Sequence, residues 1–139
     1  MIYEKSCGAV IYYCDRGRIL YLTEKMKKGH ISLCKGHVEG NETEHETAAR
    51  EIREETGLEV IFRDGFRETT KYSPYAGCMK DVIFFLAEAE TLDTVAQESE
   101  VSSIQWLTCE EAVRALTHQS DKDVLSKADK FIKEKRKQG

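Results

Sequence analysis

The sequence lacks the features that mark a secreted or membrane-spanning protein. It contains one proline, Pro74, and no stretch sustains the roughly 18 apolar residues that a membrane helix needs. The N-terminus has no apolar core of signal-peptide length. We therefore expect a protein of the cytoplasm that has no membrane partner.

Cysteine pairs at recognisable spacing are also missing. The cysteines are odd in number and include no Cys-x-x-Cys pair; they are Cys7, Cys14, Cys34, Cys78 and Cys109. This pattern argues against a disulfide framework and against a zinc motif identifiable from spacing. We expect free thiols.

Positive charge is in deficit, because 25 acidic residues face 21 basic ones and the net charge is −4. Such a chain lacks the broad basic surface that an extended nucleic acid requires, so we expect a small-molecule partner. A single domain covering residues 1–139 would bury roughly two-thirds of the unfolded surface. Whether the protein is a monomer or a homodimer stays open.

The sequence does contain a series of apolar strands separated by turn residues. The pattern predicts a hairpin of 2–13 and 19–23, a strand or bent pair over 58–62 and 66–71, a central strand at 82–87 and a strand at 104–107. Thr108 begins a capping box that opens a helix through about Leu116, and Ser120 is expected to cap a last helix.

A helix of about four turns is predicted from Thr43 to Thr56, a stretch without proline or glycine. Its expected buried face consists of Ala48, Ala49, Ile52 and Thr56. Asn41 or Glu42 is expected to cap its start, in an arrangement with Glu44 that resembles a capping box. Gly57 stands where a left-handed terminator is needed.

Three carboxylates share one face of that helix, those of Glu51, Glu54 and Glu55. Like charges at this spacing repel, so they require solvent screening or a compensating cation. Oxygen ligands select a hard ion, and Mg²⁺ or Mn²⁺ fits best. The alternative for such a pattern alone is a solvated acidic face.

The stretch from Gly36 to Leu58 places a glycine, a glutamate, an Arg-Glu pair, a Glu-Glu pair and a second glycine at fixed spacing. At every fixed position it resembles the Nudix box. That resemblance implies the Nudix fold, an α/β fold of the α+β type in which helices sandwich a mixed β-sheet. It also implies a hydrolase that cleaves a pyrophosphate bond in a nucleoside diphosphate derivative, with a divalent metal held by the box glutamates.

The resemblance assigns roles to individual residues. The catalytic carboxylates are Glu51, Glu54 and Glu55, and the metal shell adds the Gly36 carbonyl and Glu100. Arg50 is expected to orient the glutamates, and Glu42 to brace the loop. Glu54 or Glu51 would take a proton from the attacking water. By itself Glu100 could equally be a surface charge.

The chain also resembles the asymmetrical diadenosine tetraphosphate hydrolases, at the start of the box over 35–39 and beyond the box over 80–88 and 106–112. This branch implies a product pair of ATP and AMP. The chain departs from it at Cys34, where proline is usual, and at His30 and Ile31, near a usual aromatic residue. Nucleoside triphosphates, nucleotide sugars, capped RNA and a non-catalytic nucleotide sensor remain as alternatives.

Four residues are candidates for substrate binding: Lys35, Tyr72, Tyr75 and Lys80. The lysines could contact phosphate, and a tyrosine could stack against adenine. Solvated lysines and tyrosines that pack at strand ends are the competing explanations.

Overall fold

The computed structural model describes residues 1–97 and 99–138. In chain order the elements are β1 (Ile2–Asp15), β2 (Arg18–Met26), β3 (Ile31–Ser32), β4 (Cys34–His37), α1 (Glu44–Thr56), β5 (Val60–Tyr72), β6 (Cys78–Ala89), β7 (Val101–Leu107), α2 (Cys109–Ala115) and α3 (Gln119–Gln138). The predicted hairpin, box helix and central strand are all confirmed.

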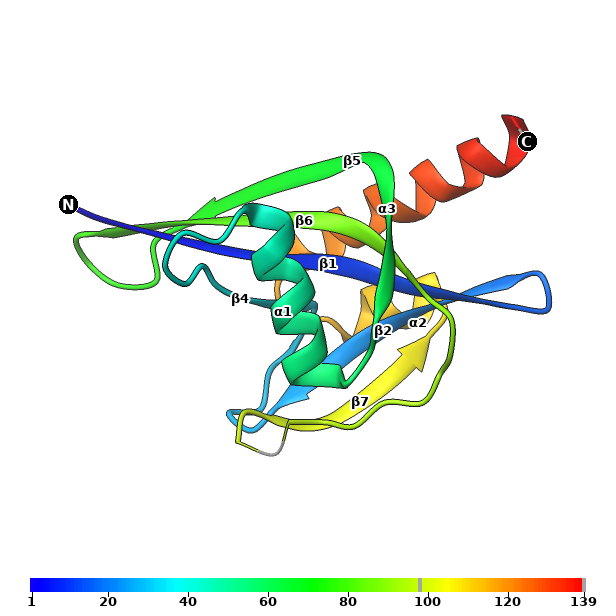
Figure 1. Cartoon of the computed structure of the whole chain (residues 1–139), viewed down its shortest axis with the longest axis horizontal. Coiled ribbons are helices and arrows are strands. Elements are labelled where there is room, and N and C mark those ends of the chain that lie inside the picture. Colours follow the sequence, from blue (N-terminus) through cyan, green and yellow to red (C-terminus); the bar gives the residue numbers. More distant parts are fainter. Residues whose placement is uncertain (98, 139) are drawn as a thin grey trace.

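One mixed sheet organises the chain. Its main path runs β3-β2-β1-β6-β5, while β4 pairs with β1 and β7 with β2. The long strand β1 is parallel to β6 and antiparallel to β2 and β4. Figure 1 shows these strands as the layer between the helices. The expected mixed sheet sandwiched between helices is therefore confirmed.

The sheet buries both of its faces. On β6, Ile83 and Phe85 pack on the side of α1, whereas Val82, Phe84 and Leu86 pack on the side of α2 and α3. Successive side chains of a strand point to opposite faces, so a strand covered on both sides is apolar throughout. This explains why the run 82–87 predicted a central strand.

The box helix α1 begins and ends by local chemistry, but its first cap differs from our expectation. Thr43 is the N-cap, and its side chain accepts from the backbone N–H of Glu46, whose own side chain accepts from Thr43. The expected caps, Asn41 and Glu42, and the expected capping-box partner Glu44 were wrong. The helix starts after Thr43, the Glu42 carboxylate is hydrogen-bonded elsewhere as described below, and the Glu44 carboxylate pairs with Arg67 and Lys5. Gly57 ends the helix at φ 76°, as predicted.

Other boundaries were also misplaced: β7 begins at Val101 rather than at 104, and β6 extends beyond 82–87 at both ends. The last helix begins at Gln119, so Ser120 lies inside it rather than at its cap. Strand β2 extends to Met26, three residues beyond the predicted Thr23, because β7 pairs along it from Tyr21 to Met26. Across residues 1–97 and 99–138, no helix has the length and apolar character needed to cross a membrane.

Candidate active site

The site begins where strand β4 meets helix α1. Backbone pairing of β4 with β1 sets Gly36 opposite Cys7 and beneath the carboxylate of Glu51. A Cβ atom at Gly36 would collide with that carboxylate. Glycine at this position therefore allows the strand backbone and a box glutamate to approach closely.

A cavity of about 360 Å³ opens between β1, β4, α1 and β6. We call it the glutamate cavity; it is lined by Ser6, Lys35, Gly36, His37, Glu39, Glu51, Glu54, Glu55, Lys80, Gln97 and Glu100. The structure thus gathers every residue of the expected metal shell around one space. It also brings two of the substrate-binding candidates, Lys35 and Lys80, into the same wall.

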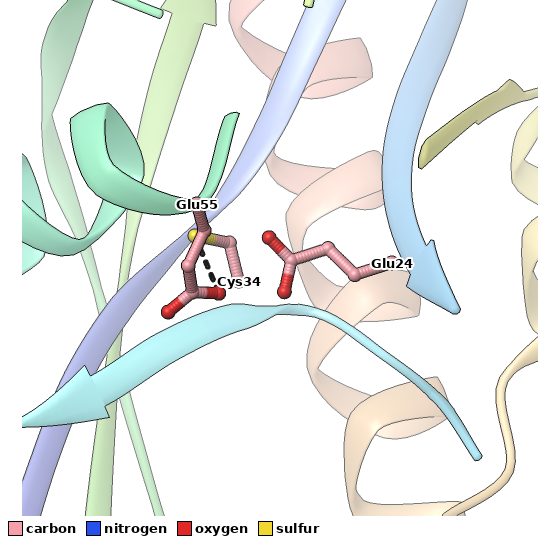
Figure 2. A group of neighbouring side chains, drawn as sticks. All are labelled: Glu24, Cys34 and Glu55. Carbon is pink, nitrogen blue, oxygen red and sulfur yellow. Dashed lines mark hydrogen bonds between the residues drawn. The ribbon is translucent and has the colours of Figure 1, made fainter. Parts of the chain in front are cut away.

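Glu55 lies at the buried side of this cavity. Its carboxylate meets Glu24 from β2 and the Cys34 thiol from β4, and the thiol donates to Glu55 Oε1 over 3.6 Å (Figure 2). Burial, and then the neighbouring carboxylates of Glu24 and Glu51, raise the pKa of Glu55. Two like charges in a place with little water favour proton or cation uptake.

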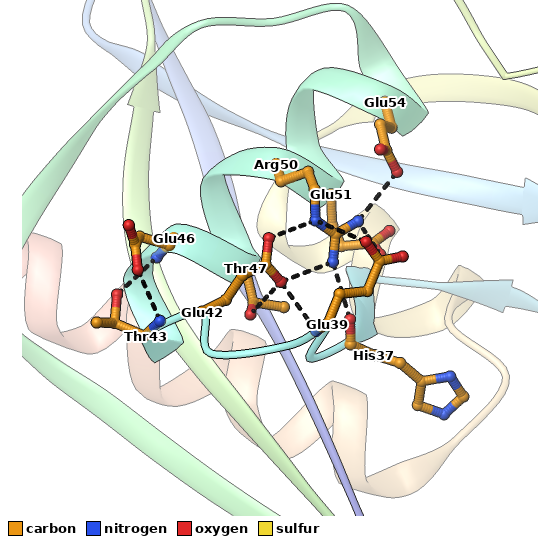
Figure 3. A network of polar contacts seen from close by, with 9 residues as sticks. All are labelled: His37, Glu39, Glu42, Thr43, Glu46, Thr47, Arg50, Glu51 and Glu54. Atoms are coloured by element: carbon orange, nitrogen blue, oxygen red, sulfur yellow. Dashed lines mark hydrogen bonds and ion pairs between the residues drawn. The ribbon is translucent and has the colours of Figure 1, made fainter.

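Arg50 holds the other two box glutamates in place (Figure 3). Its Nη1 donates to Glu51 Oε1 at 2.9 Å and to Glu54 Oε2 at 3.1 Å. Its Nη2 donates to the carbonyl of His37 at 2.9 Å, which ties the helix to the end of β4. Arg50 does not line the cavity, and its contacts are those of an orienting residue.

Glu42 connects Arg50 to the loop before the helix. It accepts two bonds from the Arg50 guanidinium, at 2.6 and 3.0 Å, one from the Thr47 hydroxyl and one from the Glu39 backbone N–H. These bonds, with Arg50 the largest contributor, lower the pKa of Glu42 to about 2. The bracing contacts expected from the sequence are present.

Glu100 reaches the cavity because the segment after β6 docks on the end of α1. The backbone N–H of Val95 donates to the carbonyl of Thr56, and that of Gln97 donates to the carbonyl of Glu55. Both bonds satisfy carbonyl groups that a helix end would otherwise leave free. The chain then turns into β7 with Glu100 on the cavity wall.

A second cavity, of about 250 Å³, adjoins the first at Lys35. We call it the histidine cavity; it is lined by His30, Lys35, Thr70, Tyr72, Val82, His118, Ser120 and Asp121. The imidazole rings of His30 and His118 lie 6.0 Å apart between centroids. The cavity therefore offers flat rings beside an acid, Asp121, that is buried at the start of α3.

Lys80, on β6, lies between the glutamate cavity and Tyr72 of the histidine cavity. Its ammonium lies 6.0 Å from the ring centroid of Tyr72 and lines the glutamate cavity. Burial, followed by the repulsion of Lys35, lowers the pKa of Lys80. Two lysines on the wall of one cavity are suited to bind a shared anion.

Tyr75 is the one predicted substrate residue that lies outside both cavities. Its side chain is in the loop before β6, is 51% exposed and donates from its hydroxyl to Glu4 Oε1 at 3.0 Å. Tyr72 is thus brought to the candidate site, and Tyr75 is not.

Sequence reasoning missed several residues of the site. Glu24 and Ser6 are each 1% exposed, and Glu24 Oε2 and Ser6 Oγ have no hydrogen-bond partner among the described residues. His118 and Asp121 enter from the far end of the chain. No local pattern distinguishes these residues from solvated or packing residues. The paired strands enclose Ser6 and Glu24, and the packing of the start of α3 brings His118 and Asp121 to the histidine cavity.

The donor groups fit a divalent cation. The carboxylates of the expected metal shell and the Gly36 carbonyl offer only oxygen, which is the ligand chemistry of Mg²⁺ or Mn²⁺; the carboxylates are those of Glu51, Glu54, Glu55 and Glu100. The cavity carries an excess of negative charge that the two lysines do not balance. A cation would compensate that charge.

Comparison with known proteins agrees with this geometry. The model of the NUDIX domain matches residues 3–128. The asymmetrical bis(5'-nucleosyl)-tetraphosphatase of Rattus norvegicus is 31% identical, over 92% of this chain and 95% of that protein. The NAD-capped RNA hydrolase NudC of Actinobacillus succinogenes is 28% identical, over 82% of this chain but 44% of its own length.

A solved structure gives the same correspondence in three dimensions. The Caenorhabditis elegans Ap4A hydrolase, crystallised as a binary complex, superposes with a TM-score of 0.85 and 28% identity. The match covers 93% of this chain and 97% of that one. The likeness therefore extends through both cavities and beyond the box.

Proposed function

This chain belongs to the NUDIX domain family and is a pyrophosphohydrolase, and we propose that its substrate is diadenosine tetraphosphate, cleaved asymmetrically to ATP and AMP. Two of the relatives that match the chain over more than 90% of its length are named an asymmetrical bis(5'-nucleosyl)-tetraphosphatase and an Ap4A hydrolase. The likeness outside the box supports the substrate, since the box itself handles only the diphosphate.

One observation carries the proposal: a carboxylate-lined cavity and a ring-lined cavity adjoin at Lys35. Flat side chains such as Tyr72 and His118 suit an adenine, and the glutamate cavity suits the polyphosphate. With a nucleoside held on one side, the carboxylates meet a phosphorus near that end of the chain. Cleavage away from the midpoint gives ATP and AMP, whereas midpoint cleavage gives two ADP.

The chemistry needs a proton acceptor, and we assign that role to Glu54. Its side chain is 49% exposed and accepts one bond, from Arg50, whereas the Glu51 side chain is 13% exposed and its carboxylate lies against Gly36. A carboxylate that keeps contact with solvent can take a proton from water and release it again.

The remaining residues bind and orient. Glu51, Glu55, Glu100 and the Gly36 carbonyl would hold the cation, and Lys35 and Lys80 would contact the polyphosphate. When bound, Mg²⁺ or Mn²⁺ would neutralise polyphosphate charge and acidify the attacking water. Water attacks phosphorus in line, the bridging P–O bond breaks, and no covalent enzyme intermediate forms.

The test is hydrolysis of diadenosine tetraphosphate in ¹⁸O-labelled water with Mg²⁺, followed by mass spectrometry of the products. We expect ATP and AMP in equal amounts, with one of them labelled. Two ADP molecules would refute the asymmetry. Rapid turnover of NAD-capped RNA, a nucleotide sugar or a nucleoside triphosphate, with this substrate left intact, would refute the substrate.

A further inference from the structure

We propose that Glu24, Cys34 and Glu55 form a zinc site at the buried side of the glutamate cavity. The three side chains come from β2, β4 and α1 and converge on one point (Figure 2). The site differs in donor chemistry from the oxygen-only shell of the box, because it includes a sulfur atom. It shares only Glu55 with that shell.

The spacing of the sulfur–oxygen pair suits a small tetrahedral ion. One ligand atom from each residue lies within 4.8 Å of the others, and Cys34 Sγ is 3.6 Å from Glu55 Oε1. Zinc–sulfur and zinc–oxygen bonds of about 2.3 and 2.0 Å at a tetrahedral angle place their sulfur and oxygen about 3.5 Å apart. The sulfur–oxygen pair therefore needs almost no movement.

The buried carboxylate of Glu24 is a second observation, besides the donor spacing, that indicates a bound ligand. It is 1% exposed, and its Oε2 atom has no hydrogen-bond partner in the described part of the chain. A buried carboxylate oxygen without a partner is costly. Figure 2 shows the Glu24 carboxylate directed toward Cys34 and Glu55.

The fold directs all three donors to one side of the sheet. Leu22, Cys34 and Ile52 belong to the core beneath α1. Glu24 follows Leu22 by two residues on the same strand, so it faces the same way. Glu24 lies opposite Ser32 on β3 and Ile104 on β7, which encloses it on both edges.

The donor set selects the ion. A thiolate favours zinc or a similar transition metal over Mg²⁺, which prefers oxygen and water. Three protein ligands leave a fourth position free for water, and the open side lies toward the glutamate cavity because Glu55 lines it. On binding, the sulfur–hydrogen bond breaks, its proton leaves to solvent and a sulfur–zinc bond forms.

Cobalt(II) is the probe, because a thiolate bound to it gives an intense charge-transfer absorption and tetrahedral coordination strengthens its visible bands. The full chain, freed of metal, is titrated with Co²⁺ and then with Zn²⁺. We expect one equivalent of Co²⁺ to produce both absorptions and Zn²⁺ to remove them.

Cys34→Ser should abolish the charge-transfer absorption. Cys78→Ser is the matched control, since Cys78 is also buried but lies outside the cluster, and it should leave the spectrum unchanged. Glu24→Gln keeps the thiol and tests the site if the serine variant folds poorly. It should weaken Co²⁺ binding by at least the roughly 10- to 100-fold that loss of an outer-shell partner costs.

Absence of the charge-transfer absorption in the wild type, or its persistence in Cys34→Ser, would overturn the proposal. So would an unchanged Co²⁺ affinity in folded Glu24→Gln. Glu54→Gln separates this site from the proposed function. It should lose hydrolysis and keep the cobalt spectrum, so each proposal can fail while the other stands.

Discussion

Replacing Arg50 with glutamine should destabilise the protein far more than an ordinary surface substitution. The guanidinium is 15% exposed and donates to Glu42, Glu51, Glu54 and the carbonyl of His37. Hydrogen bonds to charged groups contribute about 1.5–3 kcal/mol each, though not additively. The carboxylates left behind keep some solvent, so we expect a total loss of about 3 kcal/mol.

A loss of that size lowers Tm by about 10 °C in a domain of this length. The matched control is Arg53→Gln on the same helix, whose 3.8 Å pair with Glu59 is exposed and should contribute less than about 1 kcal/mol. Calorimetry of the metal-free proteins compares the two. Equal melting temperatures for the two variants would refute the idea that Arg50 stabilises the site.

The Arg50→Gln variant can also be tested through the pKa of Glu42. The Arg50 hydrogen bonds hold the pKa of Glu42 at about 2, so that pKa should return toward its ordinary value of 4.5 in Arg50→Gln. Carboxyl carbon resonances followed by NMR against pH measure this directly. Turnover should fall as well, since Glu51 and Glu54 lose the group that orients them.

Glu51→Gln and Glu55→Gln should each lower turnover by several orders of magnitude, because each removes a charge that would hold the metal. The metal-free variants should melt at or above the wild-type temperature, because a like charge has been removed. Normal rates in both variants would contradict the metal-site assignment. Glu100→Gln should lower kcat more than it changes KM, whereas Lys80→Ala should mainly raise KM; steady-state kinetics that match the wild type would make both residues ordinary surface charges. Hydrogen bonds from Arg67 and Lys5 lower the pKa of Glu44 to about 2. The ionised Glu44 therefore stabilises the fold fully above pH 4.5, and this stabilisation is lost as the pH falls toward 2. Denaturant titrations across that window should show a smaller acid loss for Glu44→Gln, and identical curves would contradict the pairing.

Local sequence patterns were sufficient to predict the box helix and the central strand. Apolar residues from Val82 to Ala87 on both faces predict a strand covered on both sides, and the carboxylates of the box predict the metal face. The N-cap was less certain because Asn41, Glu42 and Thr43 can all cap a helix. Thr43 is left to cap the helix because the Glu42 carboxylate is hydrogen-bonded to Thr47 and Arg50 of the same helix.

The parts that escaped prediction depend on pairing between distant segments. Glu24 follows an apolar strand and resembles a solvated residue until β3 and β7 pair beside it. His118 lies far along the chain from His30, yet the start of α3 brings their rings together. Periodicity describes an element and its faces, and it contains no information about which elements become neighbours.

The parallel pairing of β1 with β6 has a consequence for how the chain folds. Tyr12 bonds to Glu88 across 76 positions of sequence, so the centre of the sheet cannot close until β6 has been synthesised. Contacts at such separation slow folding, because a long loop must be ordered before the pairing offsets its entropy. Since β1 also holds β4 and Gly36, we expect the catalytic geometry to form in the late steps of folding, after most of the chain has left the ribosome.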